Sequence, residues 1–424
     1  MGVLNVSEKL NLTNSFKLYD EALGLIPGAI LGIRRPYNFV QGEYPIFFKT
    51  AKGGKVLDVD GNEYYDYLCS YGPIIIGHRE EEIDNAVIEQ IKDHGFCFSL
   101  TQPVQNELGK VLRKLIPCAE KMVLMKMGSD ATTAAVRVAR AFTKRVKILK
   151  APTYAGWHDW SSDVYGIKAG IPEKVRKDTI EFEFNDLEHV EKLLKENKDE
   201  VAAVLMTPIN TPGGDVVELP EPGYLKEMKD LAHEHGAVFI FDEIRTGFRV
   251  NIGGAQAEFG VTPDLGCFGK AMGNGYPIST LVGKEEIMNV LEHDVFLSST
   301  FFPNSLSQVA SLKTIEFLQK NNVIDTIKQR GAVLEKRIRE SIESSGIPAT
   351  YSGGSLMPYI TFQRDEKKLY KTVREEFYRQ LIRRRVFLQP YHHGYICYRH
   401  TEDDLKYTAD MIDESLNEAK KLMC

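Results

Sequence analysis

Residues 237–242 read Ala-Val-Phe-Ile-Phe-Asp, five apolar residues in a row that end at an aspartate. A short apolar run of this kind is typical of a strand that is buried on both faces of a sheet. Further strands are expected at residues 123–126, 146–149 and 201–206, and a helix or a long loop separates each strand from the next. Strands that alternate with helices predict an α/β fold, in which helices cover both faces of a mainly parallel sheet.

The two ends of the chain follow a different pattern. Residues 56–58 and 64–67 flank Asp60-Gly61-Asn62, which is a strong hairpin turn signal. Long amphipathic helices, further strands and a last helix dominate the C-terminal part, with the helices expected at residues 308–320, 325–344 and 403–422. We therefore expect a large domain at residues 61–310, and a smaller α+β domain that residues 311–424 form together with the N-terminal segment 1–60.

The composition is that of an ordinary globular protein, because 43% of the 424 residues are hydrophobic and 26% are charged. Lys and Arg number 53 against 59 Asp and Glu, for a net charge of −6, and neither sign forms a long block. This balance argues against nucleic acid or an anionic membrane as the main partner. No apolar run approaches the roughly 18 residues of a membrane span, and residues 1–15 do not resemble a signal peptide. We expect a cytoplasmic protein.

The six cysteines are widely scattered and include no CxxC pair, so buried or incidental thiols are favoured over a zinc site or disulfide bonds. His392 and His393 are adjacent and could suggest a metal site. Neighbouring side chains of a strand point to opposite faces, however, and no third ligand stands at a suitable spacing. We therefore expect no metal.

Three loops at strand ends carry the candidate chemistry, because ligands of an open α/β sheet bind where its strands end. Asp242 follows the run 237–241 directly, although a lone aspartate there could simply cap a loop. Lys270 lies among glycines and small apolar residues in the segment 263–275. Burial there would lower the pKa of the lysine and free its amine to attack a carbonyl, whereas a solvated loop lysine is the alternative.

The third loop is Gly128-Ser129-Asp130-Ala131-Thr132, which follows a strand and opens a helix. Backbone N–H groups at a helix N-terminus, together with a serine hydroxyl, can bind a phosphate. Ser129 or Asp130 could equally be an ordinary N-cap residue.

A phosphate site, an aspartate and an activated lysine in one sheet are together what pyridoxal phosphate requires. The lysine would form the Schiff base, the carboxylate would keep the ring nitrogen protonated, and the helix N-terminus would hold the phosphate. An aromatic side chain should cover the ring, and Tyr154 is well placed for this because it follows the run 146–149.

At this point the sequence resembles the class III pyridoxal-phosphate-dependent aminotransferases of fold type I, and within them the glutamate semialdehyde aminomutases. The resemblance covers most of the chain, from residue 44 to the final helix. The most specific stretches are residues 71–78, 128–132, 241–249 (Phe-Asp-Glu-Ile-Arg-Thr-Gly-Phe-Arg) and 253–265, with Lys270 after them.

The resemblance implies a role for individual residues. Lys270 would be the Schiff-base lysine and the acid and base of the proton shift, and Asp242 would pair with the pyridinium nitrogen. Ile244 would pack beneath the ring and Tyr154 above it, while Gly128 and Ser129 would hold the phosphate. Thr300 matches a threonine that reaches the phosphate from the neighbouring subunit, which implies a homodimer with shared active sites.

Some positions differ from the family pattern, and they concern the substrate. Thr207-Pro208 stands where many members have a glutamate-proline pair, and His392 stands where the aminomutase has a carboxylate. The usual Tyr-His-Gly of the cofactor loop is Tyr154-Ala155-Gly156. The first two differences remove acidic groups from the substrate side, so they favour an aminotransferase over the aminomutase.

Aromatic residues near the expected pocket would suit a sugar-like ring, among them Tyr71, Trp157, Tyr391 and Tyr395. Arg34, Arg35 and Arg399 could anchor a substrate carboxylate, or could equally be structural ion-pair partners.

We thus expect an enzyme that moves an amino group from an amino acid, glutamate first, to an aldehyde or ketone. An oxidised sugar or aminocyclitol of aminoglycoside antibiotic biosynthesis is the favoured acceptor. The alternative is glutamate-1-semialdehyde 2,1-aminomutase. A non-catalytic protein on the same fold would be expected to lack Lys270 or Asp242, and both are present.

Overall fold

A computed structural model of the chain describes residues 8–32, 36–161 and 167–423. The chain divides into two compact units. The central unit comprises Glu81–Pro212 and Glu218–Ile324, and the terminal unit comprises Met1–Glu80, Gly213–Val217 and Asp325–Cys424. The expected domain boundaries differ from these bounds, because residues 61–80 and 213–217 lie in the terminal unit and residues 311–324 in the central unit.

The central unit contains a seven-stranded sheet whose strand order is β4-β10-β9-β8-β7-β5-β6. The strands from β9 to β6 run parallel, whereas β10 is antiparallel to both β9 and β4. Their bounds are β4 Lys121–Met125, β5 Lys147–Lys150, β6 Thr179–Glu181, β7 Val201–Met206, β8 Val238–Asp242, β9 Leu265–Phe268 and β10 Ser279–Gly283. The mainly parallel sheet expected from the sequence is thus confirmed.

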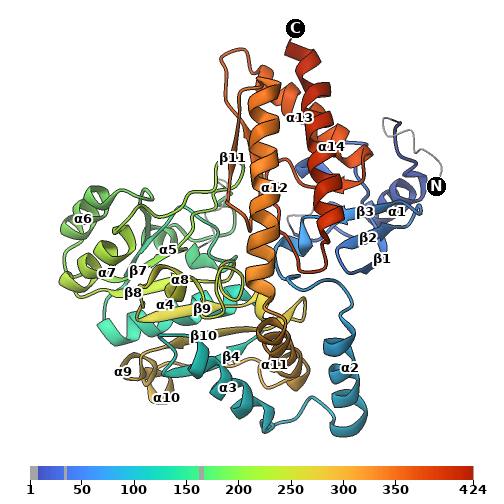
Figure 1. Cartoon of the computed structure of the whole chain (residues 1–424). Coiled ribbons are helices and arrows are strands. Elements are labelled where there is room, and N and C mark those ends of the chain that lie inside the picture. The colour runs from blue at the N-terminus through green and yellow to red at the C-terminus, as the bar shows by residue number, and fades with distance from the viewer. Residues whose placement is uncertain (1–7, 33–35, 162–166, 424) are drawn as a thin grey trace. The chain divides into compact units, whose positions relative to one another are not determined.

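Helices cover both faces of this sheet. Since alternate residues of a strand point to opposite faces, each strand contributes side chains to two separate core clusters. Leu205 and Ile240 pack in one core cluster with the alanines of α4 (Gly128–Thr143). Val204 and Phe239 pack in a second cluster with apolar residues of α6 (Leu187–Glu196) and α7 (Tyr224–Glu234). Figure 1 shows α6 and α7 together beside β7 and β8. This two-sided burial explains why the strands read as continuous apolar runs.

The remaining helices of the central unit are short, apart from α3 and α11. They are α2 Glu81–Glu89, α3 Val104–Leu115, α5 Glu173–Lys177, α8 Ala255–Phe259, α9 Glu285–Met288, α10 Val290–His293 and α11 Ser305–Lys320.

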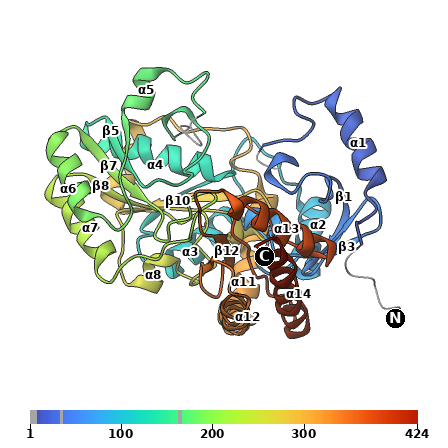
Figure 2. The same ribbon diagram turned by 90° about the horizontal axis from the view of Figure 1, so that it is seen from above.

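The terminal unit contains a four-stranded sheet of order β1-β2-β3-β13 and a separate pair, β11-β12. The expected hairpin is present, with β2 antiparallel to β3 around Asp60-Gly61. Helices α12 and α14 run side by side in Figure 1, and Figure 2 shows α12 end-on beside α14. Arg337 of α12 pairs with Asp410 of α14 at 2.6 Å. The bounds are α1 Thr13–Leu23, β1 Phe48–Lys52, β2 Lys55–Asp58, β3 Glu63–Asp66, α12 Val323–Ser345, β11 Ala349–Ser352, β12 Tyr359–Phe362, α13 Leu369–Arg383, β13 Val386–Phe387 and α14 Glu402–Lys420.

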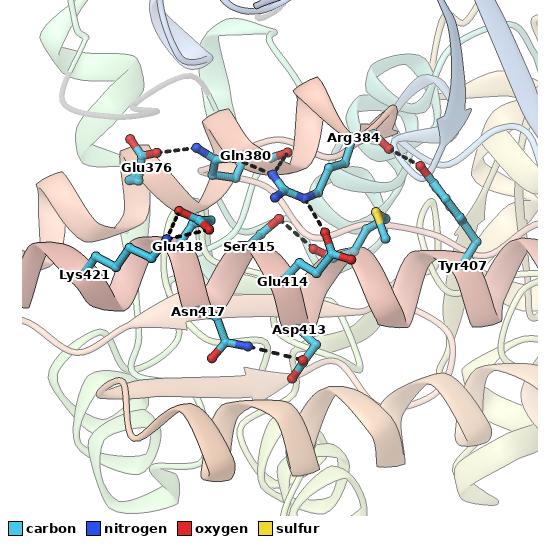
Figure 3. Close-up of polar contacts among 11 residues, drawn as sticks. Glu376, Gln380, Arg384, Tyr407, Asp413, Glu414, Ser415, Asn417, Glu418 and Lys421 are labelled. Carbon is cyan, nitrogen blue, oxygen red and sulfur yellow. Dashed lines mark hydrogen bonds and ion pairs between the residues drawn. The ribbon is translucent and has the colours of Figure 1, made fainter. Parts of the chain in front are cut away.

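Helices α13 and α14 are joined by a polar network that Figure 3 shows in close-up. Arg384, which follows α13, donates from Nε to Glu414 of α14 at 3.0 Å, and its carbonyl accepts from the Tyr407 hydroxyl at 3.0 Å. Gln380 accepts from the same guanidinium and donates to Glu376 at 2.6 Å. Because the Arg384 side chain is buried, these partners fix the end of α13 against α14.

No helix of the described part of the chain is long and apolar enough to cross a membrane. None of the five cysteines whose placement is described forms a disulfide bond, and four of them are buried.

Candidate functional site

Asp242 is the last residue of β8 and is 3% exposed. Its Oδ1 accepts a hydrogen bond from the backbone N–H of Ile244 at 3.0 Å. Its Oδ2 has no hydrogen-bond partner among residues 8–32, 36–161 and 167–423. Burial raises the pKa of Asp242, against the lowering effects of the Ile244 N–H and of the charges on Arg245 and Lys270. The carboxylate therefore keeps one oxygen available for a cationic or N–H group of a ligand.

Lys270 follows β9 and begins a single turn of 3₁₀ helix, Lys270–Gly273. Its φ of +45° lies in the left-handed region, which a side chain disfavours and which often marks a functional position. Burial and the nearby guanidinium of Arg245 hold the pKa of Lys270 well below its usual value, although Asp242 opposes this. The Lys270 amine has no hydrogen-bond partner within the described parts of the chain. A lowered pKa raises the share of the neutral amine, which is the nucleophilic form.

Register places Asp242 and Lys270 at the same edge of the sheet. Asp242 is paired with Cys267 across the parallel strands β8 and β9, and Lys270 follows three residues after Cys267. The carboxylate and the amine therefore leave adjacent strands at their C-terminal ends, as the sequence suggested.

The loop after β8 is held by Glu243, a residue that the sequence analysis did not single out. Its buried carboxylate accepts from the backbone N–H groups of Ala255 and Gln256 at 2.5 and 3.1 Å, from the Thr246 hydroxyl at 2.9 Å and from the Gln256 amide at 3.2 Å. A Cβ on Gly254, whose φ is +82°, would lie 2.6 Å from this carboxylate. Only glycine fits there, which explains the Gly-Gly-Ala-Gln stretch in physical terms.

Gly128 and Ser129 are the first two residues of α4. The N-cap residue is Met127, so neither Ser129 nor Asp130 holds that position. Asp130 is the third residue of the helix, and its Oδ2 accepts from the backbone N–H groups of Met127 at 2.9 Å and Lys126 at 3.3 Å. A Cβ on Gly128 would lie 3.0 Å from the side chain of Ile244. The start of α4 and the loop after β8 are therefore in close contact, and a side chain at position 128 would require Ile244 to shift.

Tyr154 and Trp157 lie on the loop after β5, which is fastened to the start of α4. The Trp157 N–H donates to Ser129 Oγ at 3.2 Å, and Thr132 Oγ1 donates to the carbonyl of Ala155 at 2.6 Å. The two aromatic side chains are 44% and 64% exposed, so neither belongs to the core. Ser129 is thus engaged by this loop in addition to opening the helix.

These contacts bring together Gly128, Ser129, Ile244, Asp242 and the Tyr154 loop, with Lys270 at the neighbouring strand end. Thr300 also lies in the central unit, on an exposed turn. The remaining predicted substrate residues, Tyr71, His392 and Arg399, lie in the terminal unit.

Arg399 carries a bidentate ion pair with Glu80, in which Nε and Nη2 donate to the two carboxylate oxygens at 3.0 and 2.8 Å. This favours the structural ion pair, which the sequence left open, over a substrate anchor. Arg34 and Arg35 lie outside the described residues.

The argument that His392 and His393 point apart is wrong. Their rings stack at 4.2 Å with an interplanar angle of 26°, because the two residues lie in an irregular turn and not in a strand. His392 also meets the ring of Tyr71 edge-on at 5.0 Å. No group of three or more metal-ligating side chains occurs among the residues that the structure describes.

Residues 37–400 match the sequence model of the family described as Aminotransferase class-III. The chain belongs to the class III aminotransferases. A 3-aminobutyryl-CoA aminotransferase of Cloacimonas acidaminovorans is 57% identical to it, over 99% of this chain and 100% of the relative. A glutamate-1-semialdehyde 2,1-aminomutase of Archaeoglobus fulgidus is 35% identical, over 96% of this chain and 100% of the relative.

Comparison of this class III aminotransferase with solved structures supports the same family. The FumI protein of Sphingopyxis sp. MTA144, solved with pyridoxal phosphate, superimposes with a TM-score of 0.90 at 27% identity, covering 95% of this chain and 96% of that one. An omega-transaminase of Sphaerobacter thermophilus superimposes with a TM-score of 0.87 at 25% identity, covering 98% and 99%. The fold is fold type I, and the enzyme is an aminotransferase that uses pyridoxal phosphate.

The site described above fits this cofactor. A buried carboxylate with one open oxygen suits a pyridinium nitrogen, and an unengaged amine with a lowered pKa suits attachment to an aldehyde. Gly128 and Ser129 open α4, and backbone N–H groups at a helix N-terminus suit a phosphate.

Proposed function

We propose that this enzyme exchanges an amino group between 3-aminobutyryl-CoA and a 2-oxo acid, with 2-oxoglutarate and glutamate as the oxo acid and amino acid pair. The observation that supports this proposal most strongly is the 57% identity to the Cloacimonas enzyme over essentially the whole of both chains. In this reaction the amino group of the thioester and the oxo oxygen of the acid change places, which gives a 3-oxobutyryl thioester and glutamate. Glutamate as amino donor is the reverse direction of the same exchange.

Lys270 is proposed as the residue that carries the cofactor and moves the proton. Bound pyridoxal phosphate supplies an aldehyde that takes up the amino group and a ring that accepts electrons. The lowered pKa of Lys270 leaves its Nζ able to take a proton from the carbon that bears the substrate nitrogen, and to return it elsewhere.

Asp242, Gly128, Ser129, Ile244 and Tyr154 are proposed as cofactor contacts. Asp242 would turn Oδ2 toward the ring nitrogen, and a cation there would counter the pKa rise that burial causes. The N–H groups of α4 and the Ser129 hydroxyl would bind the phosphate. Ile244, which already touches the start of α4, would support one face of the ring, and Tyr154 would cover the other.

A homodimer in which Thr300 serves the site of the neighbouring subunit remains part of the proposal. The exposure of Thr300 is consistent with this role, because a partner could reach it. Cytoplasmic location remains a prediction, as does an oxidised sugar or aminocyclitol as acceptor. Neither of the two relatives described above supports that acceptor.

A half-reaction tests the proposed function. The purified enzyme, loaded with pyridoxal phosphate, is mixed with 3-aminobutyryl-CoA alone, and the visible absorbance band of the cofactor is followed. We expect the band to shift to that of the aminated cofactor, and 2-oxoglutarate to restore it. Glutamate-1-semialdehyde should leave the enzyme without turnover. Turnover of that compound with no second substrate, together with an inert 3-aminobutyryl-CoA, would instead establish the aminomutase.

A further inference from the structure

A cationic groove lies within the terminal unit. It is a cavity of about 590 Å³ between the first turns of α13, the segment around Gly213-Gly214 and the segment around Pro390-Tyr391. The side chains that matter here are Asp215, Arg364, Tyr370, Lys371, Arg374 and Tyr391.

The groove has an excess of positive charge, with three cations against the single carboxylate of Asp215. Asp215 pairs with Arg364 at 3.4 Å, and both side chains are exposed. Lys371 and Arg374 stand three residues apart on α13, which places them on one face of the helix. Neither has a carboxylate partner among the residues that the structure describes. Their charges are therefore available to an anion.

The carboxylates of Asp365, which precedes α13, and of Glu375 on α13 are already engaged. The Asp365 carboxylate accepts from the backbone N–H groups of Leu369 and Tyr370 at 3.0 and 2.7 Å. Glu375 pairs with Arg379 at 3.0 Å. These bonds leave the positive charges of Lys371 and Arg374 uncompensated by their own helix.

Arg374 is fixed in the groove by Tyr391. Its guanidinium lies 4.3 Å from the centre of the Tyr391 ring, and its Nη2 donates to the Tyr391 hydroxyl at 2.8 Å. The ring in turn rests against Gly214, where an added Cβ would stand 3.6 Å from it. Because Tyr391 is 43% exposed, the groove offers an oriented guanidinium beside an accessible aromatic face. Phosphate beside a flat ring is the chemistry that such a pair recognises.

A second cavity of about 350 Å³ shares Lys371, Arg374, Pro390 and Tyr391 with the first. Tyr37 and Phe39 line it from the other side. The second cavity adds the Glu375 carboxylate to the shared cations, and its aromatic side chains offer a surface against which an uncharged arm of a ligand could lie.

We propose that this groove binds the 3′-phosphorylated ADP end of coenzyme A, an inference that rests on the proposed function. The acyl group of 3-aminobutyryl-CoA is a neutral thioester, so it has no carboxylate to anchor, and Arg399 is occupied by Glu80. Binding energy must then come from a remote part of the substrate. Lys371 and Arg374 bind phosphate, Tyr391 stacks on the adenine, and the second cavity accepts the uncharged arm that leads to the thioester.

The test compares two substrates that share the acyl group, namely 3-aminobutyryl-CoA and the 3-aminobutyryl thioester of N-acetylcysteamine. In the holoenzyme, the double variant Lys371→Gln/Arg374→Gln should raise KM for the CoA thioester by roughly 10- to 100-fold, since each lost charged contact changes affinity by about tenfold. The short thioester should react as in the wild type. The matched control is Lys192→Gln/Lys195→Gln on α6, where both lysines are exposed and the same charge is removed.

The outcomes separate the groove from the proposed function. An unchanged KM for the CoA thioester, or an equal loss on both thioesters, overturns the groove as the nucleotide site. If the wild type converts neither thioester, the proposed function fails, and titration of the holoenzyme with adenosine 3′,5′-bisphosphate decides the groove alone. Binding that the double variant loses and the control keeps supports the site, whereas no binding to the wild type overturns it.

Discussion

At the scale of single residues, the site depends on buried groups whose ionisation is set by their surroundings. Lys270 has its pKa lowered and Asp242 has its pKa raised, and burial is the largest cause in both cases. Burial disfavours the charged form of either group. Both residues could be singled out from the sequence, because each stands at the C-terminal end of a short apolar strand.

The lowered pKa of Lys270 predicts how the stability of the cofactor-free protein depends on pH. Between the folded-state pKa and the ordinary value of 10.5, the unfolded chain holds a proton that the folded chain lacks, so Lys270 makes stability rise with pH. Lys270→Met removes this effect. We expect the cofactor-free variant to be more stable than the wild type near neutral pH, with the gap closing toward pH 10.5, as measured by urea unfolding.

Lys284 provides the matched control for this prediction. It pairs with Asp264 at 2.6 Å, and that contact raises its pKa. Lys284→Met should therefore lower the free energy of unfolding near neutral pH, whereas Lys270→Met should raise it. A stability difference between Lys270→Met and the wild type that stays constant with pH would contradict a lowered pKa for Lys270.

Asp242→Asn tests the proposed role of the Asp242 carboxylate toward the cofactor. The amide keeps the size of the side chain and removes the negative charge that a pyridinium nitrogen requires. We expect covalent attachment of the cofactor to persist, as detected by borohydride reduction and mass spectrometry, while amino transfer falls by roughly 10²- to 10³-fold. Wild-type turnover in the variant would contradict the proposed role of Asp242.

At the scale of elements, the fold was largely predictable and the contacts of the loops were not. The run at residues 237–241 predicted a strand, and β8 is found at Val238–Asp242, one residue further along. The anchoring of Glu243 was not predictable, because its backbone partners lie 12 and 13 residues away, on α8. The partner of Arg399 stands 319 residues away, so no local pattern could reveal the ion pair.

Gly254 tests how tightly the Glu243 carboxylate holds the loop after β8. Gly254→Ala introduces a Cβ 2.6 Å from that carboxylate at a φ of +82°, and should lower the free energy of unfolding by about 2 to 4 kcal/mol. Gly260→Ala is the control, since its φ is +67° but no atom lies within 4 Å of an added Cβ. It should cost only about 1 kcal/mol. Equal losses in thermal or urea unfolding would show that the close contact with Glu243 has no effect.

At the scale of the whole molecule, the proposal makes the active site a property of a dimer. If Thr300 serves the partner's site, a mixed dimer of Lys270→Ala and Thr300→Ala subunits has one site with both defects and one intact site. Random mixing makes half of all dimers mixed, so about a quarter of wild-type activity should return when the two inactive variants are combined. Activity after mixing that merely averages the two variants would place Thr300 at the site of its own subunit, or at no site.

The central claim is that the amino group moves from a 3-aminoacyl thioester to an oxo acid. The most direct measurement supplies 3-aminobutyryl-CoA labelled with ¹⁵N at the amino group, together with 2-oxoglutarate and the holoenzyme, and follows both products by mass spectrometry. We predict ¹⁵N-glutamate and 3-oxobutyryl-CoA in equal amounts, with neither formed by Lys270→Ala. Unlabelled glutamate, or no glutamate while glutamate-1-semialdehyde is converted alone, would contradict the account.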